Sequence, residues 1–293
     1  MIRREVTFMD EKSVARQFAT QNKSPLKWLG NKSIMARTIV NMFPRHVVYI
    51  EPFLGSGSIF FAKSPSLVEI INDVNDLLVN FYTVIASDDG VDQFLKKFDT
   101  TLHSRTIYDD YKKSNWSEID PAEKAFRFYY IIRNAWNGLY RVNADGEFNA
   151  PFSGAMEHRG LARRFFNSSV LIKKAHNRLK NATIECLDYK DVFKKYDGPG
   201  VLYFLDPPYQ TTYQYSRSFD HAEFKDELKH VKGKWILTLD ESLRDNYKEY
   251  PITTINLPSK MRSTTDKEIF TNIVVSSEKF TSTHIKSLFD YAI

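Results

Sequence analysis

The chain has a single cysteine and lacks any long apolar run. That cysteine, Cys186, excludes an intrachain disulfide, and the seven histidines show no close pairing with it, so we expect no zinc site. No segment approaches the ~18 consecutive apolar residues of a membrane span, and the first residues lack the apolar core of a secretory signal. We therefore expect an intracellular, cytoplasmic protein that holds no metal ion and does not enter a membrane.

The chain also lacks internal repeats, low-complexity tracts and Gly/Ser linkers, and its composition is that of an ordinary globular protein. Hydrophobic residues make up 42% of it and charged residues 26%. With 293 residues it is long enough for one large α/β domain that carries an insertion, or for two domains.

The net charge of +5 comes from 41 basic and 36 acidic residues, and the basic excess is unevenly distributed. The segment 159–180 contains no acidic residue and the following basic ones: Arg159, Arg163, Arg164, Lys173, Lys174, Arg178 and Lys180. Such a block favours a polyanionic partner, most simply the backbone of a nucleic acid. A solvated helix face is the alternative for a charge run alone.

Strand patterns occur towards both ends of the chain. They cover residues 45–50, 67–71, 182–187, 201–205, 235–239, 252–257 and 269–276, and a helix pattern covers 75–86. Residues 87–180 show helical spacing instead, with one turn-rich piece at 138–154 that is typical of a tight hairpin. We therefore predict a Rossmann-like α/β fold with helices on both faces of the sheet. The sheet domain comprises residues 25–86 and 181–293, the mostly helical insertion residues 87–180, and an N-terminal arm residues 1–24.

The most informative segment is 201–209, where five apolar residues run into Asp206-Pro207-Pro208-Tyr209. Such a run is typical of a strand covered on both faces, and two prolines cannot continue it. Asp206 should therefore lie at the carboxyl end of a sheet strand, where open α/β folds bind ligands. A carboxylate acceptor, rigid carbonyl groups and the ring of Tyr209 favour an extruded nucleobase with an amino group. A plain turn is the alternative.

A second candidate site is the loop Gly55-Ser56-Gly57, between a predicted strand and a helix pattern. Glycines let a backbone turn sharply and approach a nucleotide. The third glycine of the dinucleotide fingerprint is missing, so an ordinary strand–helix turn is the alternative. Asp73 ends the next predicted strand, at about the 20-residue offset where an acid binds ribose hydroxyls in nucleotide folds. The ligand is therefore expected to contain a ribose.

Acidic residues gather at these predicted strand ends: Glu51, Asp73, Asp188 and Asp206. Together they suit a ligand with positive charge better than a pyrophosphate. S-adenosylmethionine, which carries a sulfonium and an ammonium group, meets this requirement. For Asp188 taken alone, a helix cap or a surface charge is the simpler interpretation.

Four motifs follow one another along the chain: Pro25-Leu26-Lys27-Trp28-Leu29-Gly30-Asn31-Lys32, Glu51-Pro52-Phe53-Leu54-Gly55-Ser56-Gly57-Ser58, Asn72-Asp73-Val74-Asn75-Asp76-Leu77 and Asp206-Pro207-Pro208-Tyr209. With them, the chain from about residue 24 to the last strands resembles the DNA adenine methyltransferase (Dam-like) family. The resemblance implies an S-adenosylmethionine-dependent enzyme. The sheet domain is then the catalytic methyltransferase domain, and the insertion is the target-recognition domain.

The resemblance also implies roles for individual residues. Trp28 and Lys32 would contact the methionine end or the adenosine of the cofactor, although a core aromatic and a surface cation are the simpler interpretations without it. Asp73 would contact the ribose, and Asp206 would lie between cofactor and target base. The cofactor-binding set is Trp28, Lys32, Glu51, Phe53, Gly55, Gly57, Asp73, Asp188 and Asp206, and the catalytic set is Asp206, Pro207, Pro208 and Tyr209.

The segments 137–143 and 146–152 resemble the hairpin with which Dam-like enzymes read GATC. A two-stranded ribbon fits the major groove of duplex DNA, where Arg141 would contact a guanine edge; a phosphate contact is the alternative. The predicted DNA-binding set is Asn137, Leu139, Arg141, Asn143, Pro151, Arg163 and Arg164. We expect double-stranded DNA as the substrate, GATC ahead of any other site, and a cognate restriction endonuclease as a further candidate partner.

Our hypothesis for the chemistry concerns the amino group of adenine. Asp206 and the Pro207 carbonyl accept hydrogen bonds from its two N–H groups, which frees the nitrogen lone pair. That pair attacks the sulfonium methyl in line as the bond from methyl to sulfur breaks, and the extra proton leaves the nitrogen afterwards. Tyr209 would stack on the flipped base. Three alternatives stay open: a methyltransferase that acts on RNA or on a protein amide, an inactive DNA-binding relative, and a nucleotide-binding dehydrogenase.

Overall fold

The computed structural model of the protein describes residues 23–28, 30–135, 148–153, 168–208, 219–258 and 269–280. The expected N-terminal arm therefore lies outside the described residues up to position 22. The same holds for most of the predicted hairpin at 138–154.

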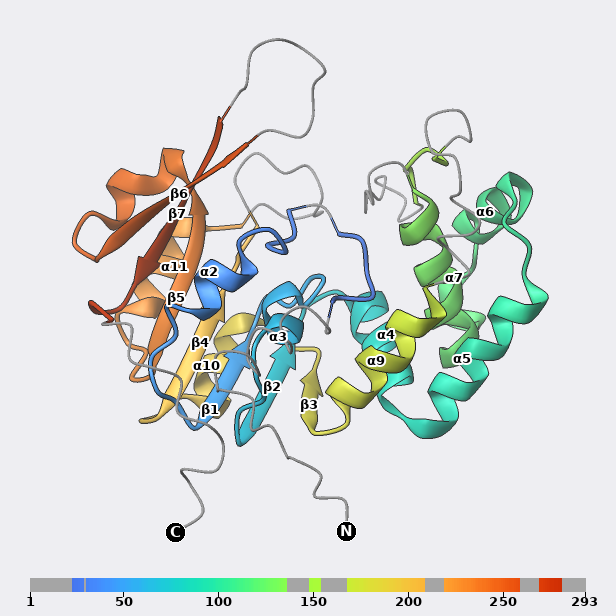
Figure 1. The fold of residues 1–293 in the computed structure, drawn as a ribbon, viewed down its shortest axis with the longest axis horizontal. Coiled ribbons are helices and arrows are strands. Elements are labelled where there is room, and N and C mark those ends of the chain that lie inside the picture. Colours follow the sequence, from blue (N-terminus) through green and yellow to red (C-terminus); the bar gives the residue numbers. More distant parts are fainter. Residues whose placement is uncertain are drawn as a thin grey trace, which may run out of the picture.

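A seven-stranded sheet forms the centre of the fold (Figure 1). In spatial order its strands are β3 (Ala182–Glu185), β2 (Val68–Asn72), β1 (Val48–Glu51), β4 (Val201–Leu205), β5 (Lys234–Asp240), β7 (Ile269–Ser276) and β6 (Ile252–Pro258). The five strands β3, β2, β1, β4 and β5 run parallel to one another, whereas β7 runs antiparallel to β5 and to β6. All the strands predicted from the sequence are present, with ends shifted by a few residues at most.

The strand order reverses between β1 and β4, where Ile50 pairs with Tyr203. Two neighbouring parallel strands whose connections leave in opposite directions open a crevice outside their carboxyl ends, and open α/β sheets bind their ligands there. The sheet topology therefore fixes in advance where a site should be.

Both faces of the sheet are covered, as the apolar run at 201–205 predicts. All five residues of β4 are buried. Leu202 and Phe204 point into one hydrophobic cluster, while Tyr203 and Leu205 point into the other. Because successive side chains of a strand alternate between faces, a continuous apolar strand is stable only between two layers.

Helices supply the two outer layers. On one face lie α2 (Ala36–Val40) and α3 (Ser58–Ala62), which contribute to the cluster around Phe204. On the other lie α10 (Tyr189–Tyr196), α11 (His221–Leu228) and the 3-10 helix η3 (Glu241–Tyr247), which contribute to the cluster around Tyr203. The prediction of helices on both faces is confirmed.

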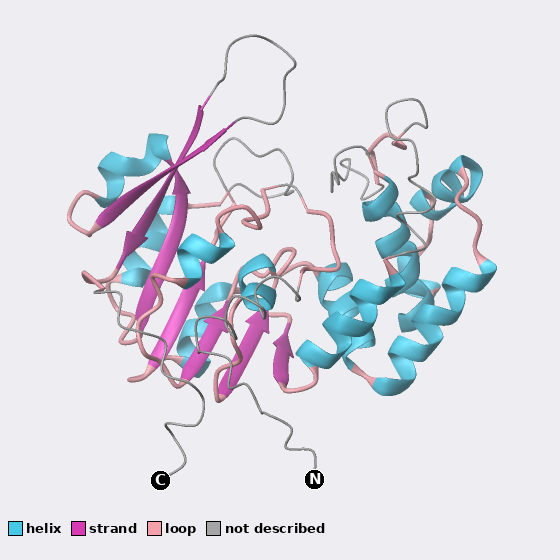
Figure 2. Ribbon diagram, in the orientation of Figure 1, coloured by secondary structure: helices cyan, strands magenta, loops and turns pink. Residues whose placement is uncertain are grey.

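A group of helices lies beside the β3 edge of the sheet (Figure 2). It comprises α4 (Asp76–Ala86), α5 (Asp88–Thr100), α6 (Arg105–Lys112), the 3-10 helix η1 (Trp116–Glu118), α7 (Pro121–Asn134) and α9 (Ser169–Leu179). Aromatic rings fill its centre; Phe81 of α4 stacks on Tyr129 of α7 with ring centroids 5.5 Å apart. Since α4 packs against α5, α7 and α9, it joins these helices to the sheet, and the domain boundary at residue 86 stays a prediction.

The last two predicted strands form an antiparallel pair at the end of the sheet. Ile252 of β6 pairs with Val275 of β7, and the register continues to Pro258 opposite Ile269. The connection between them, residues 259–268, lies outside the described residues.

In its described part, residues 168–180, the basic block at 159–180 does not form one nucleic-acid surface. Arg178 on α9 is only 7% exposed, and its guanidinium group donates to both carboxylate oxygens of Glu69 on β2. Lys180 forms an ion pair with Asp88, 2.9 Å away. Arg178 is therefore buried and already paired, and removing it from Glu69 would leave a buried charge without a partner. The interpretation as a polyanion contact is wrong for this residue. Lys173 is exposed, and Arg159, Arg163 and Arg164 lie outside the described residues.

No helix in the described part of the chain has the length and apolar character needed to cross a membrane.

Candidate active site

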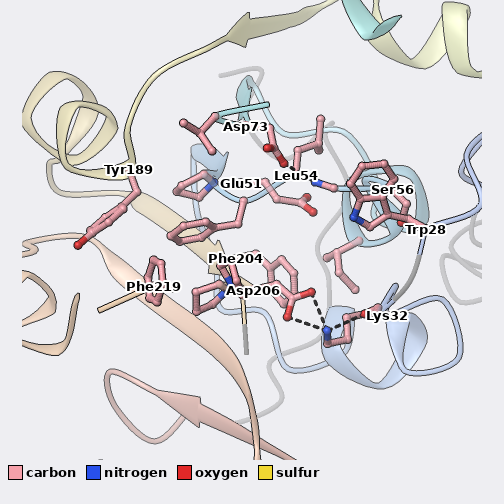
Figure 3. A pocket seen from close by; sticks show the side chains of 18 of the residues that line it. Trp28, Lys32, Glu51, Leu54, Ser56, Asp73, Tyr189, Phe204, Asp206 and Phe219 are labelled. Carbon is pink, nitrogen blue, oxygen red and sulfur yellow. Dashed lines mark hydrogen bonds and ion pairs between the residues drawn. The ribbon is translucent and has the colours of Figure 1, made fainter. Parts of the chain in front are cut away.

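A cavity of about 390 Å³ opens at the carboxyl ends of β1, β2 and β4, next to the point where the strand order reverses. Figure 3 shows it from close by, with Asp206 after β4, Glu51 at the end of β1 and Asp73 after β2. The predicted cofactor-binding residues that line it are Trp28, Lys32, Glu51, Phe53, Gly55, Asp73, Asp188 and Asp206. Residues from five separate segments of the sequence thus meet at one place.

The glycine loop after β1 is held from two sides. Gly55 has a φ of 48°, and a Cβ atom there would lie 3.2 Å from the indole ring of Trp28. Its backbone N–H donates to Oδ2 of Asp73 over 2.9 Å. A side chain at position 55 would therefore be strained and would displace Trp28.

Gly57 is the one predicted cofactor residue that does not line the cavity. It precedes α3 with a φ of 64°, and a Cβ atom there would lie 3.1 Å from the ring of Phe61. The structure gives this glycine a packing role at the start of α3. The alternative interpretation of the loop as a strand–helix turn is thus correct for Gly57.

Two carboxyl groups in the cavity have unusual acidity. Glu51 is 2% exposed, and burial raises its pKa to about 8, although the hydroxyl of Tyr49 donates to it over 2.7 Å. Burial likewise raises the pKa of Asp73 to about 6, against the effect of the backbone N–H of Gly55. Among the described residues, neither forms an ion pair with a basic side chain. The cavity therefore holds two carboxyl groups that lack a basic partner among the described residues, and burial favours the protonated form of each.

Asp206 is arranged differently. The ammonium group of Lys32 lies 2.7 Å from each of its carboxylate oxygens and also donates to the carbonyl of Gly30 (Figure 3). The hydroxyl of Thr238, on β5, donates to Oδ1 of Asp206 over 2.7 Å. The ammonium group of Lys32 thus contacts Asp206, and the predicted contact of Lys32 with a cofactor stays a prediction.

The two prolines after Asp206 line the cavity and fix the backbone beyond β4. His221, at the start of α11, contacts this turn: its Nε2 lies 3.1 Å from the carbonyl oxygen of Pro208, so Nε2 donates. Burial lowers the pKa of His221, which favours the neutral imidazole with one N–H. The turn at residues 206–208 is therefore held at Asp206 by Lys32 and Thr238 and at Pro208 by His221.

Aromatic rings line the other end of the cavity. The ring of Phe53 lies 5.5 Å from that of Tyr189 and 5.7 Å from that of Phe219. Beside them, Asp188 accepts a hydrogen bond from the N–H of Lys190 over 2.9 Å and caps α10. The helix-cap interpretation of Asp188 is confirmed, and the same side chain also lines the cavity.

Several predicted residues lie outside the described part of the chain: Tyr209, Asn137, Leu139, Arg141, Asn143, Arg163 and Arg164. Pro151 is described and exposed, and it does not line the cavity. The predicted sets thus divide into cofactor residues that the fold brings together and DNA-binding residues whose roles stay predictions.

The sequence interpretation missed Thr238, Tyr49 and the aromatic residues Tyr189 and Phe219. Thr238 had a usable signal, because it is the one polar residue in the otherwise apolar strand pattern 235–239. A hydroxyl buried in a strand needs a partner, and the open carboxylate after the neighbouring strand is one. Tyr189 follows Asp188 directly, but an aromatic residue at a helix start carries no such signal.

The sheet order, the glycine loop and the acidic cavity at the switch point define a methyltransferase-like α/β fold with a nucleotide-type cofactor site. The model of the D12 class N6 adenine-specific DNA methyltransferase family matches residues 28–287. The chain therefore belongs to this family and is an adenine-specific DNA methyltransferase that depends on S-adenosylmethionine.

Curated relatives agree with this assignment. The type II methyltransferase M.MjaIII of Methanocaldococcus jannaschii is 28% identical over 239 residues, which covers 74% of this chain and 80% of that protein. The DNA adenine methylase of Escherichia coli K12 is 30% identical over 191 residues, or 64% of this chain and 66% of that enzyme. A solved structure from Thermoplasma acidophilum covers 93% of this chain and all of its own, at 9% identity and a TM-score of 0.39, too low to support an inference.

The residues of the cavity suit S-adenosylmethionine. The buried carboxyl group of Glu51 pairs with no basic side chain among the described residues, and a ligand with a sulfonium and an ammonium group supplies positive charge. The rings of Phe53, Tyr189 and Phe219 offer flat faces for a purine. When bound, this cofactor supplies an activated methyl group.

Proposed function

We propose that this enzyme methylates adenine in duplex DNA at a short specific site, with GATC as the favoured sequence, and that Asp206 and the carbonyl of Pro207 bind the target amino group. The observation that carries the proposal is the juxtaposition of Asp206, the glycine loop and Glu51 in one cavity. An acceptor for an amino group and a region suited to a cationic methyl donor lie side by side there.

The contacts of Asp206 suit an acceptor better than a proton-removing base. Lys32 and Thr238 donate to its carboxylate but do not use all of its roughly four lone-pair positions. These two donors hold the carboxylate in one orientation, as a preorganised acceptor requires. Preorganised acceptors that orient the amino group and draw its N–H bonds out of the ring plane are then the main contribution of the protein.

The remaining cavity residues would hold the cofactor. Trp28 and Gly55 shape the wall beside Asp73, which offers acceptor oxygens to ribose hydroxyls. Glu51 would face the positive end of the cofactor, and the cluster around Phe53 its purine. Burial of these groups excludes water from the reacting atoms, which strengthens their electrostatic interactions.

The helices beside β3 support a DNA-recognition role for the segment after α7. Ala135 pairs in antiparallel fashion with Phe152, and the N–H of Ser153 donates to the carbonyl of Asn134 over 2.8 Å. The hydroxyl of Tyr108 on α6 donates to the carbonyl of Ala150 over 2.9 Å. Residues 134–135 and 152–153, on either side of segment 136–151, are therefore paired with each other, and Ala150 is bonded to α6, which supports a hairpin between them.

The choice of GATC rests on the resemblance of residues 137–143 and 146–152 to hairpins that read this site. We also propose a restriction endonuclease of the same specificity as a partner, because two relatives are named type II methyltransferases. The alternatives of an RNA or protein substrate are less supported, since the family match concerns DNA. An inactive relative is disfavoured by the intact set of Trp28, Lys32, Asp73 and Asp206 around one cavity.

The test is to incubate the purified protein with isotope-labelled S-adenosylmethionine and genomic DNA that lacks adenine methylation, and then to map the methylated positions by sequencing. We expect N6-methyladenine in GATC. Methylation confined to another sequence would contradict the proposed site, and label found only in RNA or protein would contradict the substrate. Arg141→Ala should relax the sequence preference, whereas Arg37→Ala on α2 serves as the matched control.

A further inference from the structure

Thr238 is a polar residue in an otherwise apolar environment. It belongs to β5, whose residues Trp235, Ile236, Leu237 and Leu239 are all buried, and its own exposed fraction is 0%. It lies on the same side of the sheet as Ile236, beside the end of β4, since Leu205 pairs with Leu237. A hydroxyl group at such a position is costly unless it forms a hydrogen bond.

The hydroxyl of Thr238 does form one, and its partner is the catalytic candidate. It donates to Oδ1 of Asp206 over 2.7 Å, whereas the carbonyl oxygen of Leu205 lies 3.4 Å away. Since a hydroxyl has a single proton to donate, the shorter contact with the charged acceptor dominates.

The two donors to Asp206 differ in stiffness. Lys32 reaches it from a loop before α2 on a four-carbon stem, whereas Thr238 is fixed on a central strand and branched at Cβ. A short side chain with a restricted χ1 on a paired strand defines a direction better than a long one. Thr238 is therefore placed to set the rotation of the carboxylate.

We propose that Thr238 is a positioning residue for methyl transfer: its hydroxyl orients the carboxylate of Asp206 so that the remaining lone pair faces the target amino group. The inference rests on the proposed role of Asp206 as an acceptor. Thr238 itself contacts neither the target base nor the cofactor in this account; it acts through Asp206.

The decisive variant is Thr238→Val, which keeps the shape of the side chain and removes the hydroxyl. Loss of a hydrogen bond to a charged group should lower kcat roughly 10- to 100-fold. The KM for DNA and the Kd for S-adenosylmethionine should stay within about twofold of wild type, because the effect arises in the reacting complex. Thr238→Ser retains the hydroxyl and should keep kcat within about threefold of wild type.

Two controls accompany these variants. Thr101→Val removes a buried threonine hydroxyl near Tyr111, away from the cavity, and should leave kcat unchanged. Asp206→Asn tests the role on which the inference rests. If Asp206→Asn keeps wild-type turnover, that role fails; if it loses turnover while Thr238→Val does not, only the inference on Thr238 fails.

Other results would also overturn the inference. Equal loss of kcat in Thr238→Val and Thr238→Ser would assign the effect to packing, and a parallel loss of cofactor affinity would assign it to the cofactor site. Should Thr238→Val not fold, Thr238→Ala and Thr238→Ser give the same comparison. Turnover about tenfold lower in the alanine variant alone supports the inference, and equal turnover in both contradicts it.

Discussion

Two buried glutamates on neighbouring strands show how the molecule treats charge in its framework and in its cavity. Glu51 ends β1, Glu69 lies on β2, and both are 2% exposed. Burial by itself raises the pKa of both carboxyl groups. At Glu69, hydrogen bonds from Arg178 and the charge of Lys63 outweigh burial and lower the pKa. At Glu51, the hydrogen bond from Tyr49 does not, and the pKa rises to about 8.

The difference separates a carboxylate whose charge the protein itself balances from a carboxyl group with no basic partner among the described residues. Glu69 connects α9 to the sheet through partners that the chain itself provides. Glu51 lines the cavity, and no basic side chain in the described part of the chain pairs with it. A buried carboxyl group without a cation is stable only when protonated or when a cationic ligand arrives, and the cofactor of this family is such a ligand.

The largest effect on stability should follow from removing a partner of Glu69. Arg178→Met leaves this buried carboxylate without its bidentate donor, and breaking a buried ion pair costs about 3–5 kcal/mol. Urea denaturation should show this loss in the free energy of unfolding. Lys173→Met changes an exposed residue on the same helix and should stay within about 0.5 kcal/mol of wild type. A similarly small change for Arg178→Met would contradict the structural role of the ion pair between Arg178 and Glu69.

The stability of the protein without cofactor should depend on pH through Glu51. Between the ordinary pKa of 4.5 and the raised pKa of about 8, the folded state keeps a proton that the unfolded state has lost. Stability from this group is therefore fully present below the lower pKa and falls as pH rises, by up to about 1.4 kcal/mol per pH unit. The measurement is the free energy of unfolding of wild type and Glu51→Gln at several pH values in that window.

Glu51→Gln has no carboxyl group to ionise at this position, so its stability should rise relative to wild type as pH increases. The two proteins share every other titrating group, so their difference isolates Glu51. A constant difference across the window is the result that this interpretation forbids.

Binding of the cofactor should release protons. At neutral pH Glu51 is mainly protonated in the free protein, and a cationic ligand favours its ionised form, so up to about one proton should leave per molecule bound. Calorimetry in two buffers with different ionisation heats measures this number. Glu51→Gln should release clearly fewer protons, and equal release by both proteins would mean that the cofactor does not interact with Glu51.

A smaller effect is expected at His221. His221→Leu removes the donor to the carbonyl of Pro208, and loss of one neutral hydrogen bond should lower kcat roughly 3- to 10-fold. His221→Gln, which retains an N–H donor, should recover part of the loss. Steady-state kinetics with duplex DNA compares the two, and unchanged turnover in His221→Leu would show that the prolines alone fix the turn.

The centre of the sheet could be predicted because its strands need apolar residues on both faces, as at 201–205, and because β1, β2 and β4 end at polar or proline-rich motifs. The burial of Arg178 could not, since a run of basic residues has the same pattern on a solvated face and in a buried ion pair. The contact between Lys32 and Asp206 spans 174 residues and depends on the completed sheet. Gly57 shows the same limit: the glycine pattern does not reveal that Gly57 packs near Phe61 at the start of α3 rather than lining the cavity beside Gly55.

The most direct test of the central claim is the single-turnover rate of methyl transfer by Asp206→Asn, measured with saturating cofactor on a duplex that contains the target adenine. Weakening one preorganised contact in the transition state should lower this rate roughly 10²- to 10³-fold, while the Kd for S-adenosylmethionine changes little. A rate close to wild type would contradict the account, because the amino group would then be oriented without the carboxylate at the end of β4.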